Sequence, residues 1–323
     1  MTAERCSRAV LVYSMPAIRC AFFLRDSVVN AAFTRAGEDG RLTLAVPAKG
    51  RMAEPALRLC ADAGLSFEVT ERSLVVPCAN APVDLLLVRP SDIPEYAQDG
   101  VVDLGITGAN LVAEAGAEVE TVAELGFARC TLDAAVPVDG PQQELGDLDG
   151  LRVATAYPMS TERLLGERGI RCELVHVSGS VEATPRLGLA DAIVDLVSTG
   201  STMDANGLRP IGTLLASQAV LVGGRDAIEE RRDLVDRLEL MLSGVVAARR
   251  RRYVMLNARV EDLPAIRAVL PGMGAPSVLQ LADEGQIAVH AAVDAGEIWT
   301  LLPRLKEAGG TSILVLPVER LVP

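Results

Sequence analysis

The sequence predicts an α/β protein made of two lobes and a smaller C-terminal domain. Three observations predict this class. Apolar strands alternate with helix patterns from Arg41 onward, the alternation restarts after a polar connector at residues 139–150, and the last third has the order βαββαβ. The chain has 323 residues, which is enough for two or three domains that each bury a core.

The first lobe opens on a buried strand, because residues 42–46 are almost continuously apolar. A helix is expected at residues 54–63, since Pro55 lies in its first turn and Gly64 comes directly after its end. The same signals predict strands at residues 84–88 and 103–107 and helices at residues 93–99 and 109–115. Strands that alternate with helices are typical of a parallel sheet covered by helices.

The second lobe repeats this rhythm. Strands are expected at residues 151–156, 173–177 and 192–197, with a helix at residues 161–168. Two successive α/β units predict two lobes with a cleft between them. Ligands of such folds bind outside the carboxyl ends of the strands, so the turns after these strands are the candidate binding segments.

The C-terminal third begins with a long helix expected at residues 229–252, which ends in four arginines. RNA binding is one interpretation of these arginines, but in an acidic chain we favour a solvated helix end that complements the helix dipole. The rest of this third has the ferredoxin-like order, with elements expected at residues 253–259, 261–270, 277–281, 287–293, 296–308 and 312–316.

The domain boundaries are set by this pattern. We expect the first lobe to comprise residues 41–133 and 205–245, the second lobe residues 134–204, and the C-terminal domain residues 246–323. Residues 9–18 are an apolar run that faintly resembles a signal peptide, but Arg19 and Arg25 interrupt the sequence that follows it and no clean cleavage site is present. We expect residues 1–40 to be a poorly ordered extension or a product of start-site choice.

Composition excludes several function classes. The net charge is −12 and aromatic residues make up 3% of the chain, which argues against nucleic-acid binding. No apolar stretch reaches the length of a membrane span. The six cysteines form no CxxC pair, so we expect reduced, buried thiols in a cytoplasmic protein.

The sharpest motif runs from Asp195 to Thr202, where an apolar strand delivers an acid followed by Ser-Thr-Gly-Ser-Thr. Gly200 lets the backbone approach an anion, and successive amides and hydroxyls can surround a phosphate. Asp195 can accept hydrogen bonds from ribose hydroxyls and stabilise positive charge on the ribose ring. An ordinary strand-to-helix turn with capping hydroxyls is the alternative.

A second motif, Lys49-Gly50-Arg51, comes after the first strand. Two cations beside a glycine at a helix start suit an oligophosphate, although two solvated side chains would look the same. Arg89 comes after the second strand in the same way, whereas Asp103 starts its strand and is equally well explained as structural. Glu182, after the strand at residues 173–177, either lines the same sugar-phosphate site as the Asp195 to Thr202 motif or belongs to a helix cap.

From about Arg41 to the C-terminus the sequence resembles the long form of the ATP phosphoribosyltransferases. Collinear motifs carry the resemblance: Lys49-Gly-Arg51, Val88-Arg-Pro-Ser-Asp-Ile-Pro94, Asp99-Gly-Val-Val-Asp-Leu-Gly-Ile-Thr-Gly108, Ser178-Gly-Ser-Val-Glu182, Gly188 to Thr202, Ala205-Asn-Gly-Leu208 and Ser312 to Pro317. Residues 1–40 match nothing in that family. The resemblance implies a two-lobed, periplasmic-binding-protein-like catalytic core and a C-terminal regulatory domain.

The reaction implied by the resemblance joins ATP and phosphoribosyl pyrophosphate, with Mg²⁺, into phosphoribosyl-ATP and pyrophosphate. Adenine N1 carries a lone pair and no proton, so no dedicated general base is required; positioning and electrostatics supply the catalysis. No compact protein metal site is expected, because Mg²⁺ binds mainly through waters and substrate phosphates.

The implied site residues fall into three groups. Arg51 and Asp195 would be catalytic. The donor would be bound by Glu182, Asp191, Asp195, Ser198, Thr199, Gly200, Ser201 and Thr202, and ATP by Lys49, Gly50, Arg51, Arg89 and Asp103. Thr199→Ala and Gly200→Val should each greatly raise the donor KM.

The resemblance also implies feedback inhibition by histidine at Asn257, Ser277 and Ser312, and assembly into homodimers and homohexamers. Ser277 stands where the family more often has Thr. Two other functions stay open on the residues alone: a two-lobed solute-binding protein without catalysis, and a transferase acting on another base or amine. Incubation with ATP, phosphoribosyl pyrophosphate and Mg²⁺ distinguishes all three.

Overall fold

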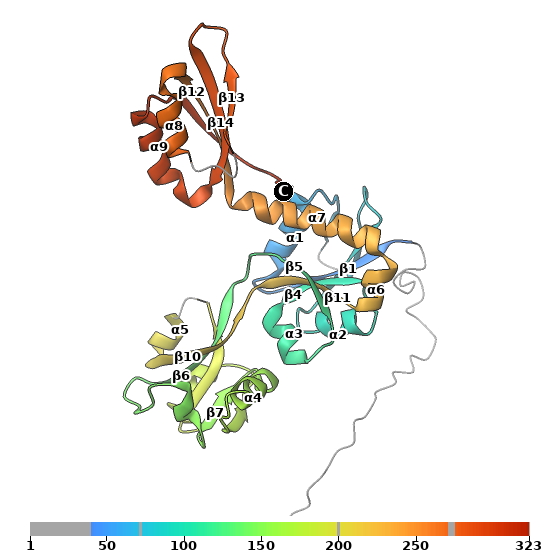
Figure 1. The fold of residues 1–323 in the computed structure, drawn as a ribbon. Coiled ribbons are helices and arrows are strands. Elements are labelled where there is room, and N and C mark those ends of the chain that lie inside the picture. The colour runs from blue at the N-terminus through green and yellow to red at the C-terminus, as the bar shows by residue number, and fades with distance from the viewer. Residues whose placement is uncertain (1–39, 71–72, 199–200, 271–274, 323) are drawn as a thin grey trace, which may run out of the picture. The chain divides into compact units, whose positions relative to one another are not determined.

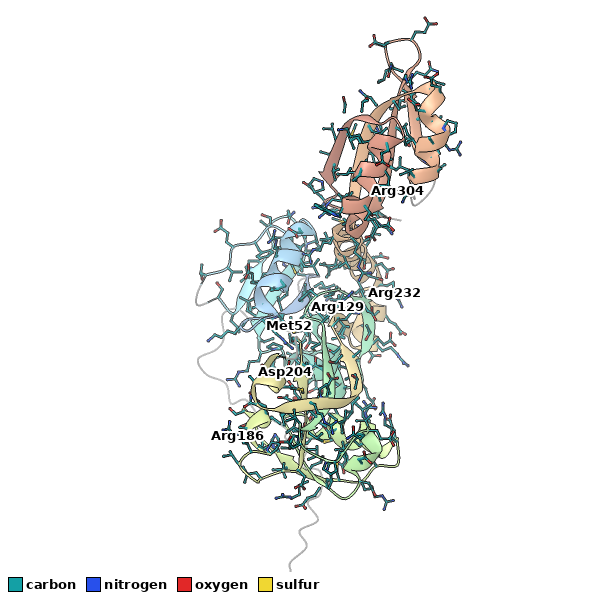
Figure 2. All side chains as sticks on the ribbon, turned by 90° about the vertical axis from the view of Figure 1, so that its left-hand side faces the viewer. Met52, Arg129, Arg186, Asp204, Arg232 and Arg304 are labelled. Atoms are coloured by element: carbon teal, nitrogen blue, oxygen red, sulfur yellow. The ribbon has the colours of Figure 1, made fainter. Side chains whose placement is uncertain are left out.

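The computed structural model describes residues 40–70, 73–198, 201–270 and 275–322 (Figure 1). These residues form a six-stranded, a five-stranded and a four-stranded sheet. We call the first sheet with its helices lobe I, the second lobe II, and the third the C-terminal domain; in Figure 2, Met52 marks lobe I and Asp204 marks lobe II. The expected extension at residues 1–40 lies, except for Gly40, outside the described residues.

The sheet of lobe I has the order β2-β3-β1-β4-β11-β5. Its strands are β1 (Leu42–Pro47), β2 (Val75–Pro77), β3 (Val83–Val88), β4 (Leu104–Gly108), β5 (Glu120–Glu124) and β11 (Ala219–Gly223). Helices α1 (Ala53–Asp62) and α7 (Arg232–Arg249) pack on one face, and α2 (Ile93–Gln98) and α3 (Ala109–Ala115) on the other. The predicted strands and helices of this lobe are therefore present within a residue or two.

The prediction of a parallel sheet is only partly correct. Strands β3, β1 and β4 run parallel, whereas β2 and β11 pair antiparallel with their neighbours. Strand β11 enters lobe I directly from β10 of lobe II, with only Gln218 between the two strands. A parallel strand would require a crossover connection, and none precedes β11, which therefore runs antiparallel. The sequence pattern did not indicate β2, β5 or β11. Strand β2 is only three residues long, and β5 and β11 pair with each other across about a hundred residues of chain.

Lobe II has the sheet order β10-β6-β9-β7-β8. Its elements are β6 (Cys130–Pro137), β7 (Arg152–Thr155), α4 (Pro158–Gly166), β8 (Glu173–His176), η2 (Val181–Ala183), β9 (Ala192–Val197), α5 (Ser201–Ala205) and β10 (Leu208–Ser217). Strands β6 and β10 both pair in this sheet. The sheets therefore divide near residues 125–129 and at Gln218, not at the expected boundaries 133/134 and 204/205.

The chain passes between the lobes twice, at residues 125–129 and at Gln218, and we call these the crossing segments. The two crossing segments are hydrogen-bonded to each other at Ala219, the residue after Gln218. The Leu125 amide donates to the Ala219 carbonyl, and the Ala219 amide donates to the Phe127 carbonyl, both at 2.9 Å. Gly126 and Ala128 have positive φ angles of 73° and 51°. This tight, twisted crossing is where the two lobes are connected.

The C-terminal domain has the predicted order. Its elements are β12 (Arg251–Arg259), α8 (Leu263–Val269), β13 (Ser277–Gln280), β14 (Gln286–Asp294), α9 (Ile298–Glu307) and β15 (Thr311–Pro317). The sheet order β13-β14-β12-β15 is antiparallel throughout, as in ferredoxin-like domains. Helices α8 and α9 cover one face, which holds the core of this domain.

The single long helix predicted at residues 229–252 is wrong in two places. The segment is split into α6 (Arg225–Glu230) and α7, with the break at Arg231, and Arg251 and Arg252 open strand β12 instead of ending the helix. Arg231 leaves the helical path where its side chain pairs with Asp103. Only Arg249 of the four arginines ends α7, and it pairs with Asp62 at 3.1 Å.

The cysteines are free where the structure describes them. Cys60, Cys78 and Cys130 are buried and Cys172 is half-buried. Burial raises the pKa of the Cys60 thiol to about 12, with the nearby Cys78 adding to the effect, so this thiol is unreactive at neutral pH. Within the described ranges, none of the helices combines enough length and apolar character to span a bilayer.

Candidate active site

The predicted binding segments lie after the carboxyl ends of parallel strands in both lobes. In lobe I, Lys49 to Arg51 come after β1 and Arg89 comes after β3. In lobe II, Glu182 comes after β8 and Ser198 after β9. These are the edges at which α/β folds bind ligands.

A direct hydrogen bond links the two lobes at these edges. Nη1 of Arg51 donates to Oγ of Ser198 at 2.5 Å, although the residues lie 147 positions apart. Both side chains are exposed. The cationic turn of lobe I therefore meets the start of the phosphate-loop motif of lobe II, as two halves of one anion site require.

The turn after β1 is also pinned to the turn after β3. The Ala48 amide donates to the Val88 carbonyl at 2.7 Å, which brings the segments of Lys49 and Arg89 side by side. Gly50 has a φ angle of 83°, and a Cβ added there would meet nothing within 4 Å. The need for glycine is thus one of backbone conformation. Lys49 and Arg89 are exposed and carry positive charge to this edge.

Asp195 lies near the end of β9 and is partly buried. Burial raises the pKa of its carboxyl group, the charge of Glu182 raises it further, and the hydrogen bond from the Leu196 amide at 2.8 Å lowers it. Glu182 lies two residues after Ser180, whose φ angle of 53° is unusual for a residue with a side chain. A poorly solvated negative charge of this kind interacts strongly with positive charge nearby.

The sequence pattern gave no indication of Tyr157, which precedes α4 at the carboxyl end of β7. Burial raises the pKa of its hydroxyl, the charge of Asp195 raises it as well, and the charge of Arg51 lowers it. Tyr157 therefore lies within electrostatic reach of groups from both lobes. The helix was predicted from Thr161, but Pro158 at its first position is the signal that could have marked the true start.

Two predicted site residues lie at the opposite edges of their sheets. Asp103 precedes β4 and is 5% exposed; it accepts a hydrogen bond from the Thr43 amide at 2.7 Å and pairs with Arg231. Asp191 precedes β9 and accepts from the Arg152 amide and guanidinium. Because parallel strands turn their amino ends away from the carboxyl edge, neither carboxylate is brought to the candidate site. Their contacts are structural.

The central part of the phosphate-loop motif, Thr199 and Gly200, lies outside the described residues. Ser201 and Thr202 begin the short helix α5. The Thr202 carbonyl accepts a hydrogen bond from the Asn206 side chain at 2.9 Å, and the Thr202 side chain is exposed. The motif thus passes from the end of β9 into a helix start, the local arrangement in which backbone amides bind phosphate.

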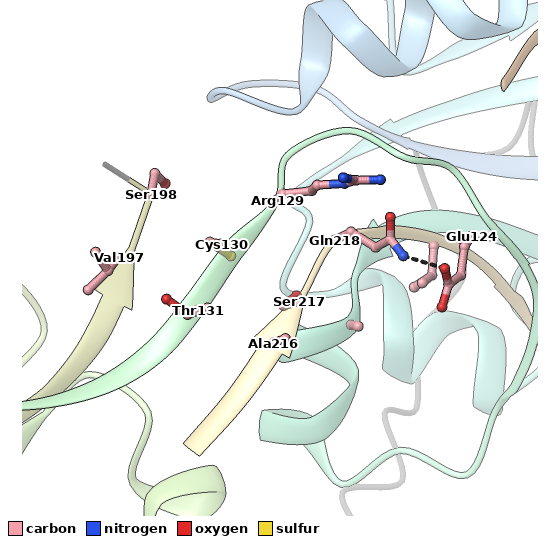
Figure 3. A pocket seen from close by; sticks show the side chains of 11 residues that line it. Glu124, Arg129, Cys130, Thr131, Val197, Ser198, Ala216, Ser217 and Gln218 are labelled. Atoms are coloured by element: carbon pink, nitrogen blue, oxygen red, sulfur yellow. Dashed lines mark hydrogen bonds between the residues drawn. The ribbon is translucent and has the colours of Figure 1, made fainter. Parts of the chain in front are cut away.

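A cavity of about 520 Å³ lies at the crossing segments (Figure 3). Ser198 lines it on the lobe II side, and Arg129 supplies a positive charge from the segment between β5 and β6. Gln218 donates from Nε2 to Oε2 of Glu124 at 2.5 Å, which joins the two crossing segments through their side chains. Ser198 of the predicted phosphate motif therefore lines a space to which both lobes contribute residues.

The predicted inhibitor residues lie on three strands of the C-terminal sheet. Asn257 is on β12 with Thr311 opposite, Ser312 is the next residue on β15 with a φ angle of 48°, and Ser277 on β13 lies opposite His290. The Asn257 carbonyl accepts from Oγ1 of Thr311 at 3.1 Å. Asn257 and Ser312 are thus neighbours, while β14 separates both from Ser277.

Comparisons with known proteins agree with this architecture. The family model described as "HisG: ATP phosphoribosyltransferase" matches residues 89–244, and the model described as "HisG, C-terminal domain" matches residues 248–320. An ATP phosphoribosyltransferase of Methanosarcina barkeri is 39% identical over 289 residues, which cover 87% of this chain and 100% of the relative. One from Maricaulis maris is 42% identical, with 87% and 99% covered.

Among solved structures, the "ATP phosphoribosyl transferase (HisG:HisZ) complex from Thermotoga maritima" contains a chain that superposes with a TM-score of 0.54 at 27% identity. The match covers 62% of this chain and 98% of that one. The first family model thus covers Arg89, Glu182 and Ser198 of the candidate site.

Proposed function

Because the chain belongs to the ATP phosphoribosyltransferase family, we propose that its two lobes together transfer a phosphoribosyl group from phosphoribosyl pyrophosphate to N1 of ATP. This reaction releases pyrophosphate and is the first step of histidine biosynthesis. The relatives from Methanosarcina barkeri and Maricaulis maris are both ATP phosphoribosyltransferases. They therefore argue against the two alternatives, a non-catalytic solute-binding protein and a transferase for another base.

The hydrogen bond between Arg51 and Ser198 carries the assignment of the site. A transfer between two anionic substrates requires both to lie in one cleft, with cations near the phosphates and a phosphate cradle on the facing lobe. Lys49, Arg51 and Arg89 supply the cations from lobe I, and Ser198 begins the cradle in lobe II. The contact between Arg51 and Ser198 supports a donor site at Ser198 to Thr202 and an ATP site at the lobe I turns.

In the proposed mechanism, the lone pair of adenine N1 attacks C1′ of the ribose while the bond from C1′ to the pyrophosphate oxygen breaks. Positive charge develops on the ribose, and Asp195 stabilises it, because a carboxylate with a raised pKa is poorly solvated and interacts strongly. Arg51 stabilises the negative charge that moves onto the pyrophosphate. N1 carries no proton, so no group has to act as a general base.

Mg²⁺ is part of the proposal. The described residues contain no cluster of three His, Cys, Asp or Glu side chains that could hold a metal ion. Asp195 and Glu182 fit outer contacts to an ion that the donor pyrophosphate and water molecules hold, which is the usual way in which Mg²⁺ binds with phosphate substrates. When bound there, Mg²⁺ would neutralise charge on the leaving group.

One assay tests the function. The purified protein is incubated with ATP, phosphoribosyl pyrophosphate and Mg²⁺, and product formation is measured by the absorbance change of phosphoribosyl-ATP and by pyrophosphate release. We expect product only when both substrates are present. Tight binding of either substrate without turnover would favour the solute-binding alternative instead.

Regulation and assembly complete the proposal. We propose that histidine binds the C-terminal domain near Asn257 and Ser312, since these residues are neighbours on β12 and β15. Histidine titrations of the initial rate, with calorimetric binding as an independent measurement, test this role.

We also propose that the chain assembles into homodimers and homohexamers, which sedimentation with and without histidine would detect. We propose a cytoplasmic location, because ATP and the donor are available there.

A further inference from the structure

Helix α4 begins without a cap of its own. Its N-cap residue, Tyr157, makes no side-chain capping bond to the described residues, and the first turn contains no acidic residue. The first amides of a helix lack partners within the helix and carry partial positive charge, so they require an acceptor from elsewhere. In α4 that acceptor comes from the other lobe.

Glu114, near the end of α3 in lobe I, caps α4 with both carboxylate oxygens. Oε1 accepts from the Met159 amide at 3.0 Å, and Oε2 accepts from the Ser160 amide at 2.8 Å. A carboxylate on two amides at a helix start gains from hydrogen bonding and from the helix dipole together. The two bonds join residues that lie 45 and 46 positions apart, on helices of different lobes.

The other end of α3 is fixed at the crossing between the lobes. The Asn110 amide donates to Oγ of Ser217, and that hydroxyl donates to Oδ1 of Asn110, both at 2.9 Å. Both residues are buried. The first turn of α3 is therefore anchored beside the connection between the lobes, at Ser217. Its last turn contacts helix α4 of lobe II through Glu114.

The capped turn is also the turn that carries Tyr157. This residue directly precedes α4. Besides burial, the charges of Asp195 and Glu114 raise the pKa of its hydroxyl, and the charge of Arg51 lowers it. A shift of the α4 start relative to lobe I would break both bonds to Glu114. The same shift would move Tyr157 relative to Arg51.

We propose that Glu114 is a positioning residue that holds the Tyr157–Ser160 turn of lobe II against lobe I and so sets the arrangement in which substrates meet. Its effect on turnover rests on the proposed function, whereas its effect on the α4 amides does not. Glu114 acts through α4 and need not touch either substrate.

The test compares Glu114→Ala and Glu114→Gln with the matched control Glu118→Ala. Glu118 is exposed on the same segment, and its side chain takes part in no hydrogen bond or ion pair of the described residues. Hydrogen exchange of the Met159 and Ser160 amides is measured by NMR in each protein. We expect exchange about tenfold faster in Glu114→Ala, a smaller increase in Glu114→Gln, which keeps one acceptor oxygen, and no change in the control.

Steady-state kinetics supplies the second readout. We expect kcat/KM for both substrates to fall about tenfold in Glu114→Ala, with partial recovery in Glu114→Gln, at a temperature at which each variant is folded. Unchanged amide exchange would overturn the proposal. Faster exchange with unchanged kcat/KM would reduce Glu114 to a structural cap. If the parent protein shows no turnover, the proposed function fails and the exchange result still decides whether Glu114 holds the turn.

Discussion

Arg231 and Asp103 form an ion pair of 3.1 Å whose side chains are only 16% and 7% exposed. The pair joins the break between α6 and α7 to the start of β4, and the same carboxylate accepts from the Thr43 amide. Three elements of lobe I thus meet at one buried charge, at the sheet edge opposite the candidate site.

Asp103→Ala should therefore affect stability and leave catalysis unchanged. The substitution leaves the Arg231 guanidinium and the Thr43 amide without their acceptor, and removing one partner of a buried pair costs about 3–5 kcal/mol. Urea denaturation measures this loss. We expect kcat/KM of the folded variant to stay within about twofold of the parent; a large kinetic loss with normal stability would return Asp103 to the ATP site.

Asp191→Asn should have a small effect. Its pair with Arg152 is 37% and 41% exposed, and exposed pairs contribute about 0–1 kcal/mol. The guanidinium of Arg152 lowers the pKa of the Asp191 carboxyl, so the stability that it contributes is present above the ordinary pKa and lost as pH falls through the lowered value. Thermal unfolding at pH 7 and in acid should show the small difference from the parent only at pH 7. A raised donor KM in this variant would contradict the structural interpretation.

Asp195→Asn should separate stability from activity. The folded-state pKa of Asp195 is raised, so the ionised carboxylate destabilises the fold above that pKa, and this cost vanishes as pH falls to the ordinary value near 3.8. The Asn variant should melt at a higher temperature than the parent at pH 7 and at a similar temperature near pH 4. We expect its kcat to fall by about 10²-fold, because the carboxylate that stabilises the ribose cation is lost.

Pairwise substitution of Arg51 and Ser198 tests the contact between the lobes. Arg51→Ala should lower kcat/KM by about 10²-fold and Arg51→Lys by less, since lysine keeps the charge without the planar fork of donors. Ser198→Ala should mainly raise the donor KM. If the residues act at one site, the double variant Arg51→Ala/Ser198→Ala will lose less activity than the sum of the single losses in free energy.

Local pattern was sufficient for most elements of the fold. Helix α3 and strand β9 begin and end where the sequence predicts, and the βαββαβ order of the C-terminal domain is confirmed. Periodic apolar residues and the glycines and prolines at element ends encode such segments within a few positions. The antiparallel strands β5, β6, β10 and β11 escaped prediction because their edges are satisfied by partners far along the chain.

The sequence by itself determined the chemistry of the turns: cations at Lys49 to Arg51, and an acid followed by hydroxyls and glycine from Asp195 to Thr202. Only the tertiary structure decided which of these groups meet. It brings Arg51 to Ser198 and Glu114 to the start of α4, and it turns Asp103 and Asp191 away to the far edges of their sheets. The physical reason is that contacts between distant segments depend on strand direction and on the packing of the lobes, which no local period of side chains specifies.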